Sequence, residues 1–139
     1  MKMTMLTAAV LLALAPAAFA ATETYTADLK ASNEVPANDS KASGMLNATY
    51  DTASKKLTYS ATYKDLTGPA TMAHFHGPAD TKTNAKVVVP VKDMTPNVLK
   101  GEATLTPEQA ADLEAGKWYF NIHTEKNKGG EIRGQVMKK

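Results

Sequence analysis

Apolar and polar residues alternate along most of the chain after residue 20, and this period of two predicts short β-strands. The alternating or β-branched segments are 25–29, 46–50, 57–63, 72–76, 87–91, 99–105, 118–123 and 131–136. The clearest neighbours are 46–50 and 57–63, which flank the turn residues 51–55. Because each of these two segments places its apolar residues on one face, we expect an antiparallel hairpin packed on a core.

One segment breaks the alternation and carries the signals of a short helix. Thr106 is a suitable N-cap, Pro107 follows at the first helical position, and Gln109 completes a capping box. Gly116 suits the position after the last turn, so the helix is expected over 107–115. About eight strands with one short connecting helix predict an all-β fold, an antiparallel Greek-key β-sandwich or barrel.

The first twenty residues differ in character from the rest. Lys2 precedes a short apolar run, and the segment ends in Ala18-Phe19-Ala20. A charged start, a short apolar run and an Ala-x-Ala end are typical of a secretory signal peptide, and the run is too short to span a membrane. We therefore expect residues 1–20 to be removed on export, residues 21–139 to form one domain, and the location to be periplasmic or secreted.

Composition narrows the functions to be considered. The chain has no cysteine, which excludes disulfides, thiolate chemistry and cysteine-based zinc sites. Its formal net charge is +2, too small and too evenly spread to indicate a nucleic-acid partner. The Gly-x-Ser-x-Gly pattern of many hydrolases is absent from the sequence. An exported domain of this kind must be held together by core packing, with or without a bound ion.

The three histidines are the residues with candidate chemistry. His74 and His76 alternate with Phe75 in one predicted strand, and His123 ends another. All three imidazoles face outward if the apolar faces of both strands point into the core. If the two strands are neighbours the rings meet, and neutral imidazole is the commonest protein ligand for transition metals. The competing interpretation makes these histidines ordinary polar residues on wet strand faces.

Three ordered motifs span nearly all of residues 21–139. They are Leu29-Lys-Ala-Ser-Asn-Glu-Val-Pro, Ala73-His-Phe-His-Gly-Pro-Ala, and Asn121-Ile-His-Thr followed by Gly130-Glu-Ile-Arg-Gly-Gln. This set resembles the signature of the CHRD domain, a family named for chordin and also widespread as a single-domain exported protein in bacteria. The resemblance implies a β-sandwich, and it implies no established reaction.

A weaker resemblance is to copper–zinc superoxide dismutase, another Greek-key sandwich. That family carries a His-x-His pair, a later histidine and an arginine beside the copper, and the same order is found here in His74, His76, His123 and Arg133. The disulfide cysteines, the bridging histidine and the zinc ligands of that family are missing. Only the analogy of a mononuclear three-histidine copper site carries over.

The sequence leaves three functions open. The first is a metal-binding module that uses His74, His76 and His123, with copper preferred because it tops the divalent affinity order, and zinc as the alternative. The second is a protein-interaction or structural module without metal. The third, less expected, is a copper redox enzyme such as a dismutase.

Three residues near the histidines in the sequence each have two possible roles. Met72 is a soft extra ligand or an ordinary rim residue. Glu131 and Arg133 either support the metal site or form an ion pair on a wet face. A protein partner and the oligomeric state are left open.

Overall fold

The computed structural model describes residues 13–15 and 19–139, so most of the predicted signal segment 1–20 lies outside the described residues. The described elements are β1 (Thr22–Lys30), η1 (Ala31–Asn33), β2 (Ser43–Asp51), β3 (Lys56–Lys64), β4 (Met72–His76), β5 (Val87–Pro90), β6 (Val98–Thr104), α1 (Pro107–Glu114), β7 (Tyr119–His123), β8 (Ile132–Gln135) and β9 (Met137–Lys138). No helix in the described part of the chain has the length and apolar character needed to cross a membrane.

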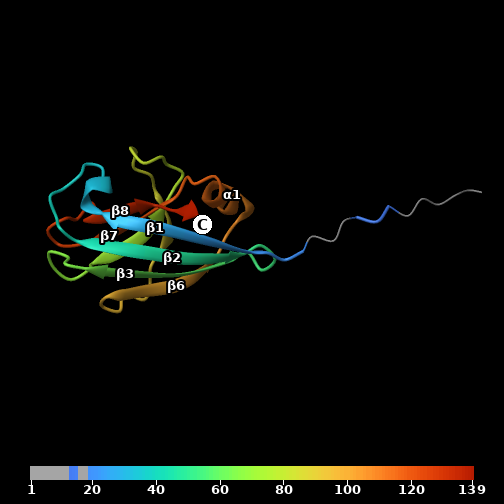
Figure 1. Ribbon diagram of the computed structural model, residues 1–139, viewed down its shortest axis with the longest axis horizontal. Helices are drawn as coiled ribbons and strands as arrows, with labels where there is room; N and C mark the ends of the chain where they lie inside the picture. The colour runs from blue at the N-terminus through green and yellow to red at the C-terminus, as the bar shows by residue number, and fades with distance from the viewer. Residues whose placement is uncertain (1–12, 16–18) are drawn as a thin grey trace, which may run out of the picture.

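The strands form a nearly closed antiparallel barrel, as the alternation predicted. Their order is β5-β4-β7-β8-β1-β2-β3-β6, and β9 pairs with β1. The two ends of this path approach each other at a bridge between Asp93, just after β5, and Lys100 in β6. Strands β1, β2, β3 and β6 run side by side in Figure 1, and α1 lies near one end of them. The predicted hairpin is β2–β3, paired in antiparallel register along its whole length.

The core is built from the apolar faces that the alternation predicted. In β1, β2 and β3 the buried positions are Tyr25, Ala27, Leu29, Leu46, Ala48, Tyr50, Leu57, Tyr59 and Ala61. Phe75 of β4 is fully buried among them, and its ring centroid lies 4.9 Å from those of Tyr59 and Phe120. Because neighbouring side chains of a strand point to opposite faces, the burial of Phe75 turns His74 and His76 to the outer face of the barrel.

Helix α1 forms through the capping box that the sequence predicted. Thr106 Oγ1 accepts a hydrogen bond from the Gln109 backbone N–H, and Gln109 Oε1 accepts one from the Thr106 N–H, at 3.2 and 3.0 Å. The helix ends at Glu114, one residue earlier than predicted. Gly116 follows with a φ of 71°, the left-handed conformation that favours glycine. Leu113 is the main buried contact of this short helix with the barrel.

The outer face of β4 and β7 is covered, which the sequence did not indicate. Every residue of β7 is buried, and His76 and His123 are only 8% and 6% exposed. The covering layer consists of loops: the backbone of residues 80–85 and 124–130 makes hydrogen bonds to side chains on this face. The prediction of wet strand faces is therefore wrong for these two histidines, and His74 alone keeps partial exposure.

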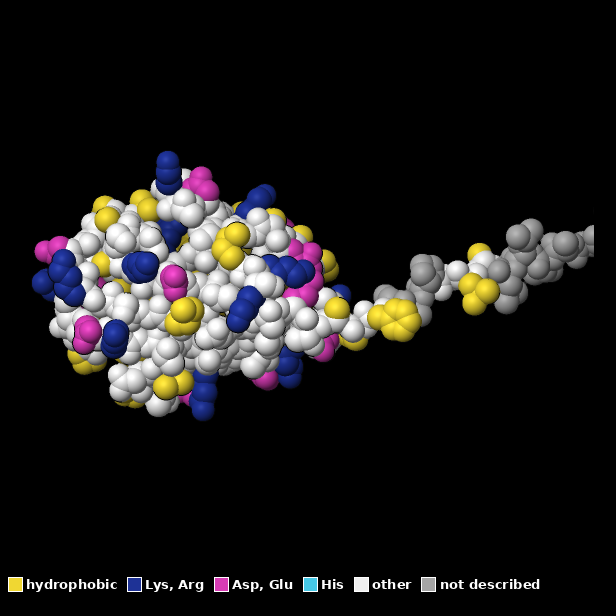
Figure 2. All heavy atoms as spheres, viewed as in Figure 1, with side chains coloured by type: hydrophobic (Ala, Val, Ile, Leu, Met, Phe, Trp, Pro, Cys, Tyr) yellow, Lys and Arg dark blue, Asp and Glu magenta, His cyan; other side chains and the backbone are white. Residues whose placement is uncertain are grey.

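The face of the molecule shown in Figure 2 carries lysines and acidic residues mixed together, with no histidine in view. This mixture agrees with the small net charge of the chain.

Candidate metal site

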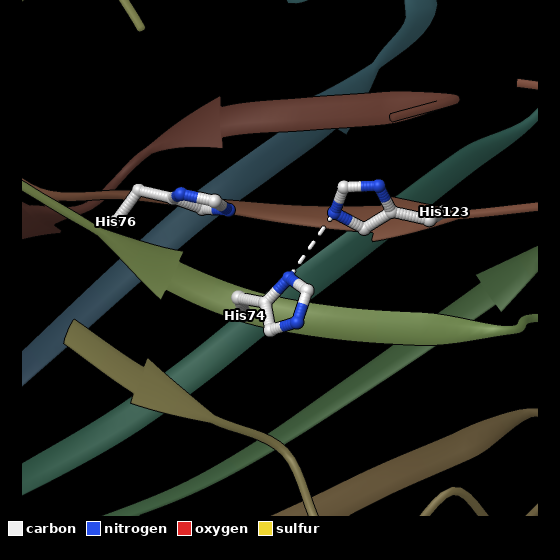
Figure 3. A group of neighbouring side chains, drawn as sticks. All are labelled: His74, His76 and His123. Carbon is white, nitrogen blue, oxygen red and sulfur yellow. Dashed lines mark hydrogen bonds between the residues drawn. The ribbon is translucent and has the colours of Figure 1, made fainter. Parts of the chain in front are cut away.

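Strands β4 and β7 bring the three histidines together. The register pairs Met72 with His123 and His74 with Asn121, so His74 and His123 are diagonal neighbours. Their Nδ1 and Nε2 atoms are 3.2 Å apart. One ring nitrogen from each histidine lies within 4.8 Å of those of the other two. Figure 3 shows the three rings turned toward a shared space, and the convergence predicted from the sequence is present.

Backbone carbonyl groups fix the protonation of two of these rings. His76 Nδ1 lies 2.9 Å from the carbonyl oxygen of Ala85, and His123 Nδ1 lies 2.8 Å from that of Lys128. A carbonyl oxygen only accepts, so in each case Nδ1–H is the donor. In the neutral ring the other nitrogen, Nε2, then carries a lone pair. Both Nε2 atoms therefore present lone pairs to the interior of the cluster.

The surroundings favour neutral imidazoles. Burial, together with the neighbouring His123 and His76, lowers the pKa of His74 to about 4. Burial also lowers the pKa of His76, although its hydrogen bonds with Ala85 and Asn121 oppose this shift. At neutral pH both rings are uncharged, which is the form that binds metal ions.

Asn121 completes the cluster, and the sequence analysis did not single it out. Its Oδ1 lies 2.9 Å from His76 Nε2 and 3.0 Å from His123 Nε2. Asn121 is buried and is the register partner of His74. The alternation of β7 places it on the same face as His123, which is the signal that could have identified it.

Glu34 lies beside the amide of Asn121 and was also missed. A Cβ on Gly130 would collide with Glu34 Oε1 and would lie 2.7 Å from Asn121 Nδ2, so both atoms border the same spot. Glu34 is 5% exposed, and burial raises its pKa to about 7, against the opposing effects of Arg133 and the Asn121 amide. Its position in the first of the three sequence motifs was the available signal.

Arg133 supports the site from behind. Its guanidinium carbon lies 3.5 Å from the centroid of the Tyr119 ring, and that ring stacks on His76 with centroids 4.7 Å apart and planes 6° apart. Arg133 also donates to the carbonyl oxygens of Asp80 and Thr83, at 3.0 and 2.7 Å. These bonds hold the loop whose Ala85 carbonyl orients His76. Arg133 is thus separated from the histidine cluster by Tyr119, unlike the arginine beside the copper in superoxide dismutase.

The CHRD family model, described as the CHRD domain, matches residues 25–136. The chain belongs to the CHRD domain family. Neither the curated proteins nor the solved structures gave a match. The matched region of this CHRD domain contains all three histidines, Asn121 and Glu34, so the site lies within the family fold.

Glu131 of this CHRD domain is buried and accepts hydrogen bonds from residues of three loops. Within the described part of the chain it forms no ion pair with Arg133. Its carboxylate accepts hydrogen bonds from the Ser40 hydroxyl (2.9 Å), the Thr67 N–H (2.9 Å) and hydroxyl, the Thr124 hydroxyl (2.7 Å) and the Asn127 amide (2.9 Å). Burial alone would raise the pKa of Glu131, but these donors hold it at about 2. Of the two interpretations of Glu131 and Arg133, the ion pair on a wet face is wrong, because both residues are buried.

Met72 lies at the rim of the site. It is the register partner of His123, and its side chain is about half exposed, at 48%. This position fits the ordinary rim residue that was one of its two interpretations.

Proposed function

We propose that this CHRD domain is an exported module that binds one copper ion at His74, His76 and His123. The observation that carries the proposal is the fixed protonation of two rings. The Ala85 and Lys128 carbonyls hold the protons of His76 and His123 on Nδ1, so two Nε2 lone pairs converge with His74 on one space. A cation bound between the rings would accept these lone pairs and remove their mutual repulsion. Outer-shell acceptors of this kind orient the histidines of known metal sites.

The donor set favours copper. Three neutral imidazoles suit copper, zinc, iron and nickel, and copper has the highest affinity among the divalent ions for such a site. No carboxylate or thiolate belongs to the described cluster. Zinc held by three histidines and a water is the alternative, as in some catalytic zinc sites.

Calorimetric titration of chelator-treated protein with Cu(II), and separately with Zn(II), tests the site. We expect one ion per chain, tighter binding of copper than of zinc, and loss of binding in His74→Ala. Met72→Leu is the matched control, because it changes a side chain on the same face of the same strand. Its Cu(II) affinity should stay within threefold of wild type. Wild-type protein that binds no Cu(II), or His74→Ala that binds it equally well, would refute the proposal.

Export rests on the sequence pattern of residues 1–20. Mass spectrometry of protein recovered from the periplasm or medium of an expressing bacterium should give an N-terminus at Ala21. Full-length protein retained in the cytoplasm contradicts this part of the proposal.

One observation favours the second candidate, a structural or interaction module without metal. The hydrogen bonds of His76 and His123 to Ala85 and Lys128 anchor two loops, and they do so without any ion. Thermal melting separates the two functions, since an ion that binds only the native state raises stability by mass action. A melting temperature that is the same with chelator and with excess copper or zinc supports the metal-free module.

A further inference from the structure

The buried amide of Asn121 lies among histidine nitrogens that offer it no hydrogen to accept. Its Oδ1 is 2.9 Å from His76 Nε2 and 3.0 Å from His123 Nε2, distances typical of hydrogen bonds. Yet both rings already donate through Nδ1 to backbone carbonyls, so in the neutral state both Nε2 atoms are acceptors. Asn121 Oδ1 therefore contacts two other acceptor atoms, and the lone pairs in each contact repel one another unless a positive charge lies between them.

Three short contacts link the four donor atoms of the cluster in a chain. His74 Nδ1 lies 3.2 Å from His123 Nε2, which lies 3.0 Å from Asn121 Oδ1, which lies 2.9 Å from His76 Nε2. Ligand atoms held at about 2.0–2.1 Å from one ion are roughly 2.9 Å apart at right angles and about 3.3 Å apart at tetrahedral angles. Each consecutive pair of these four donor atoms is therefore spaced as neighbouring ligands of one ion, and the three histidine nitrogens all lie within 4.8 Å of one another.

Glu34 accounts for the orientation of the amide. Asn121 Nδ2 and the Glu34 carboxylate border the same spot beside Gly130. The ionised form of Glu34, which a cation at the cluster favours, attracts an amide N–H and repels an amide oxygen, so Nδ2 faces Glu34 and Oδ1 faces the histidines. Glu34 Oε1 is buried and has no hydrogen-bond partner among the described residues, so the carboxylate is not engaged elsewhere through that atom.

We propose that Asn121 Oδ1 is the fourth ligand of the metal ion held by the three histidines, and that Glu34 is a positioning residue that keeps this oxygen turned toward the ion. This inference rests on the proposed function, because it needs an ion at the histidine cluster. Three nitrogens and one oxygen form the donor set typical of tetragonal Cu(II) sites.

The test uses Asn121→Leu, which removes the oxygen and keeps the size of the side chain. Purified protein is loaded with Cu(II), and electron paramagnetic resonance spectra are recorded in ordinary and ¹⁷O-labelled water. We expect Asn121→Leu to bind Cu(II) at least about tenfold more weakly. Nitrogen coupling from three imidazoles should persist, and line broadening by ¹⁷O-water should increase as water takes the vacated position. Asn47→Leu, at an exposed strand position, is the control and should match wild type.

Glu34→Gln tests the positioning role. The neutral amide introduced by this substitution no longer discriminates between the two ends of the Asn121 side chain, so Cu(II) affinity should fall and ¹⁷O broadening should increase. Neither change should occur when Glu34→Gln is added to Asn121→Leu, because the oxygen being positioned is already gone. Equal effects in both backgrounds would show that Glu34 acts on the fold rather than through Asn121.

The possible failures are distinguishable. If Asn121→Leu keeps wild-type affinity and shows no added ¹⁷O broadening, Asn121 is not a ligand, while the three-histidine site stands. If wild-type protein binds no Cu(II), or His74→Ala binds it equally well, the site itself is wrong. Should Asn121→Leu fail to fold by circular dichroism, Asn121→Asp replaces it, because Asp retains an oxygen at the same position. Asn121→Asp should bind Cu(II) without added ¹⁷O broadening, and loss of binding would overturn the assignment.

Discussion

Replacing Glu131 by Gln should destabilise the protein in a way that depends on pH. The carboxylate is fully buried and accepts hydrogen bonds from three separate loops, through Ser40, Thr67, Thr124 and Asn127. Gln keeps the shape of the side chain and removes the charge. Whichever end its N–H₂ group takes, that group faces an N–H donor that cannot accept a hydrogen bond: the Thr67 backbone N–H at one end or the Asn127 amide at the other.

The size of the effect follows from the pKa of Glu131, which is about 2 in the folded protein against an ordinary value of 4.5. At roughly 1.4 kcal/mol per pKa unit, this difference amounts to about 3 kcal/mol of folding stability at neutral pH. Because the folded pKa is depressed, the contribution is fully present above pH 4.5 and is lost as the pH falls toward 2. At pH 3 about 1 kcal/mol of it should remain.

Urea denaturation of wild type and Glu131→Gln, with chelator in every sample, measures this difference between pH 6 and pH 3. The two unfolding free energies should differ by about 3 kcal/mol at pH 6 and should converge as the pH falls. Glu102→Gln is the matched control, because it alters an exposed ion pair with Lys56 that is expected to be worth less than about 1 kcal/mol. A Glu131→Gln variant as stable as this control at pH 6, or a difference that stays constant down to pH 3, would refute the reasoning.

Three further predictions concern the shell around the site. Gly130→Ala should lower the unfolding free energy measured by urea denaturation by about 2–3 kcal/mol, because a Cβ at a φ of 128° is strained and would collide with the side chains of Glu34 and Asn121. Gly129→Ala is the control and should leave the unfolding free energy nearly unchanged, because the space around Gly129 is open. Arg133→Met removes the hydrogen bonds to the carbonyl groups of Asp80 and Thr83, so the loop 80–85 should become more mobile and trypsin should cleave faster at exposed Lys82 in timed digests. An unchanged cleavage rate would show that Arg133 does not hold this loop in place. Copper at 100 times its dissociation constant should stabilise wild type by about 2.7 kcal/mol and leave His74→Ala unchanged in calorimetric melting; equal stabilisation of both would place the ion elsewhere.

The strands and the helix could be predicted because their signals are local. Alternation around Tyr59 and Phe75 named the buried faces correctly, and Thr106 with Gln109 located the start of α1. The meeting of His74 with His123 followed from the same alternation together with one assumption, that their strands are neighbours. The register of β4 on β7 confirms that assumption.

The covering of the outer face could not be predicted, because loops have no period that shows which side they pack on. One of the two interpretations of Arg133 and Glu131 places them on a wet face, since charged residues on a strand next to a polar loop usually face water. Here Arg133 is satisfied mostly by loop carbonyl oxygens, and Glu131 by hydroxyl and amide groups far apart in the sequence. Asn121 and Glu34 were missed for the same reason, because their partners are set by tertiary structure rather than by spacing.

The first strand, β1, lies between β2 on one side and the last strands, β8 and β9, on the other. While the polypeptide is being synthesised, one edge of β1 therefore stays unpaired until residues about a hundred positions further along the chain have been made, since Lys30 pairs with Arg133. Until then that edge has free N–H and C=O groups and invites mispairing with other chains. Removing residues 136–139 would leave the part of that edge at Tyr25 and Thr26 permanently unpaired, and the damage would appear as aggregation during production rather than as a defect confined to β9.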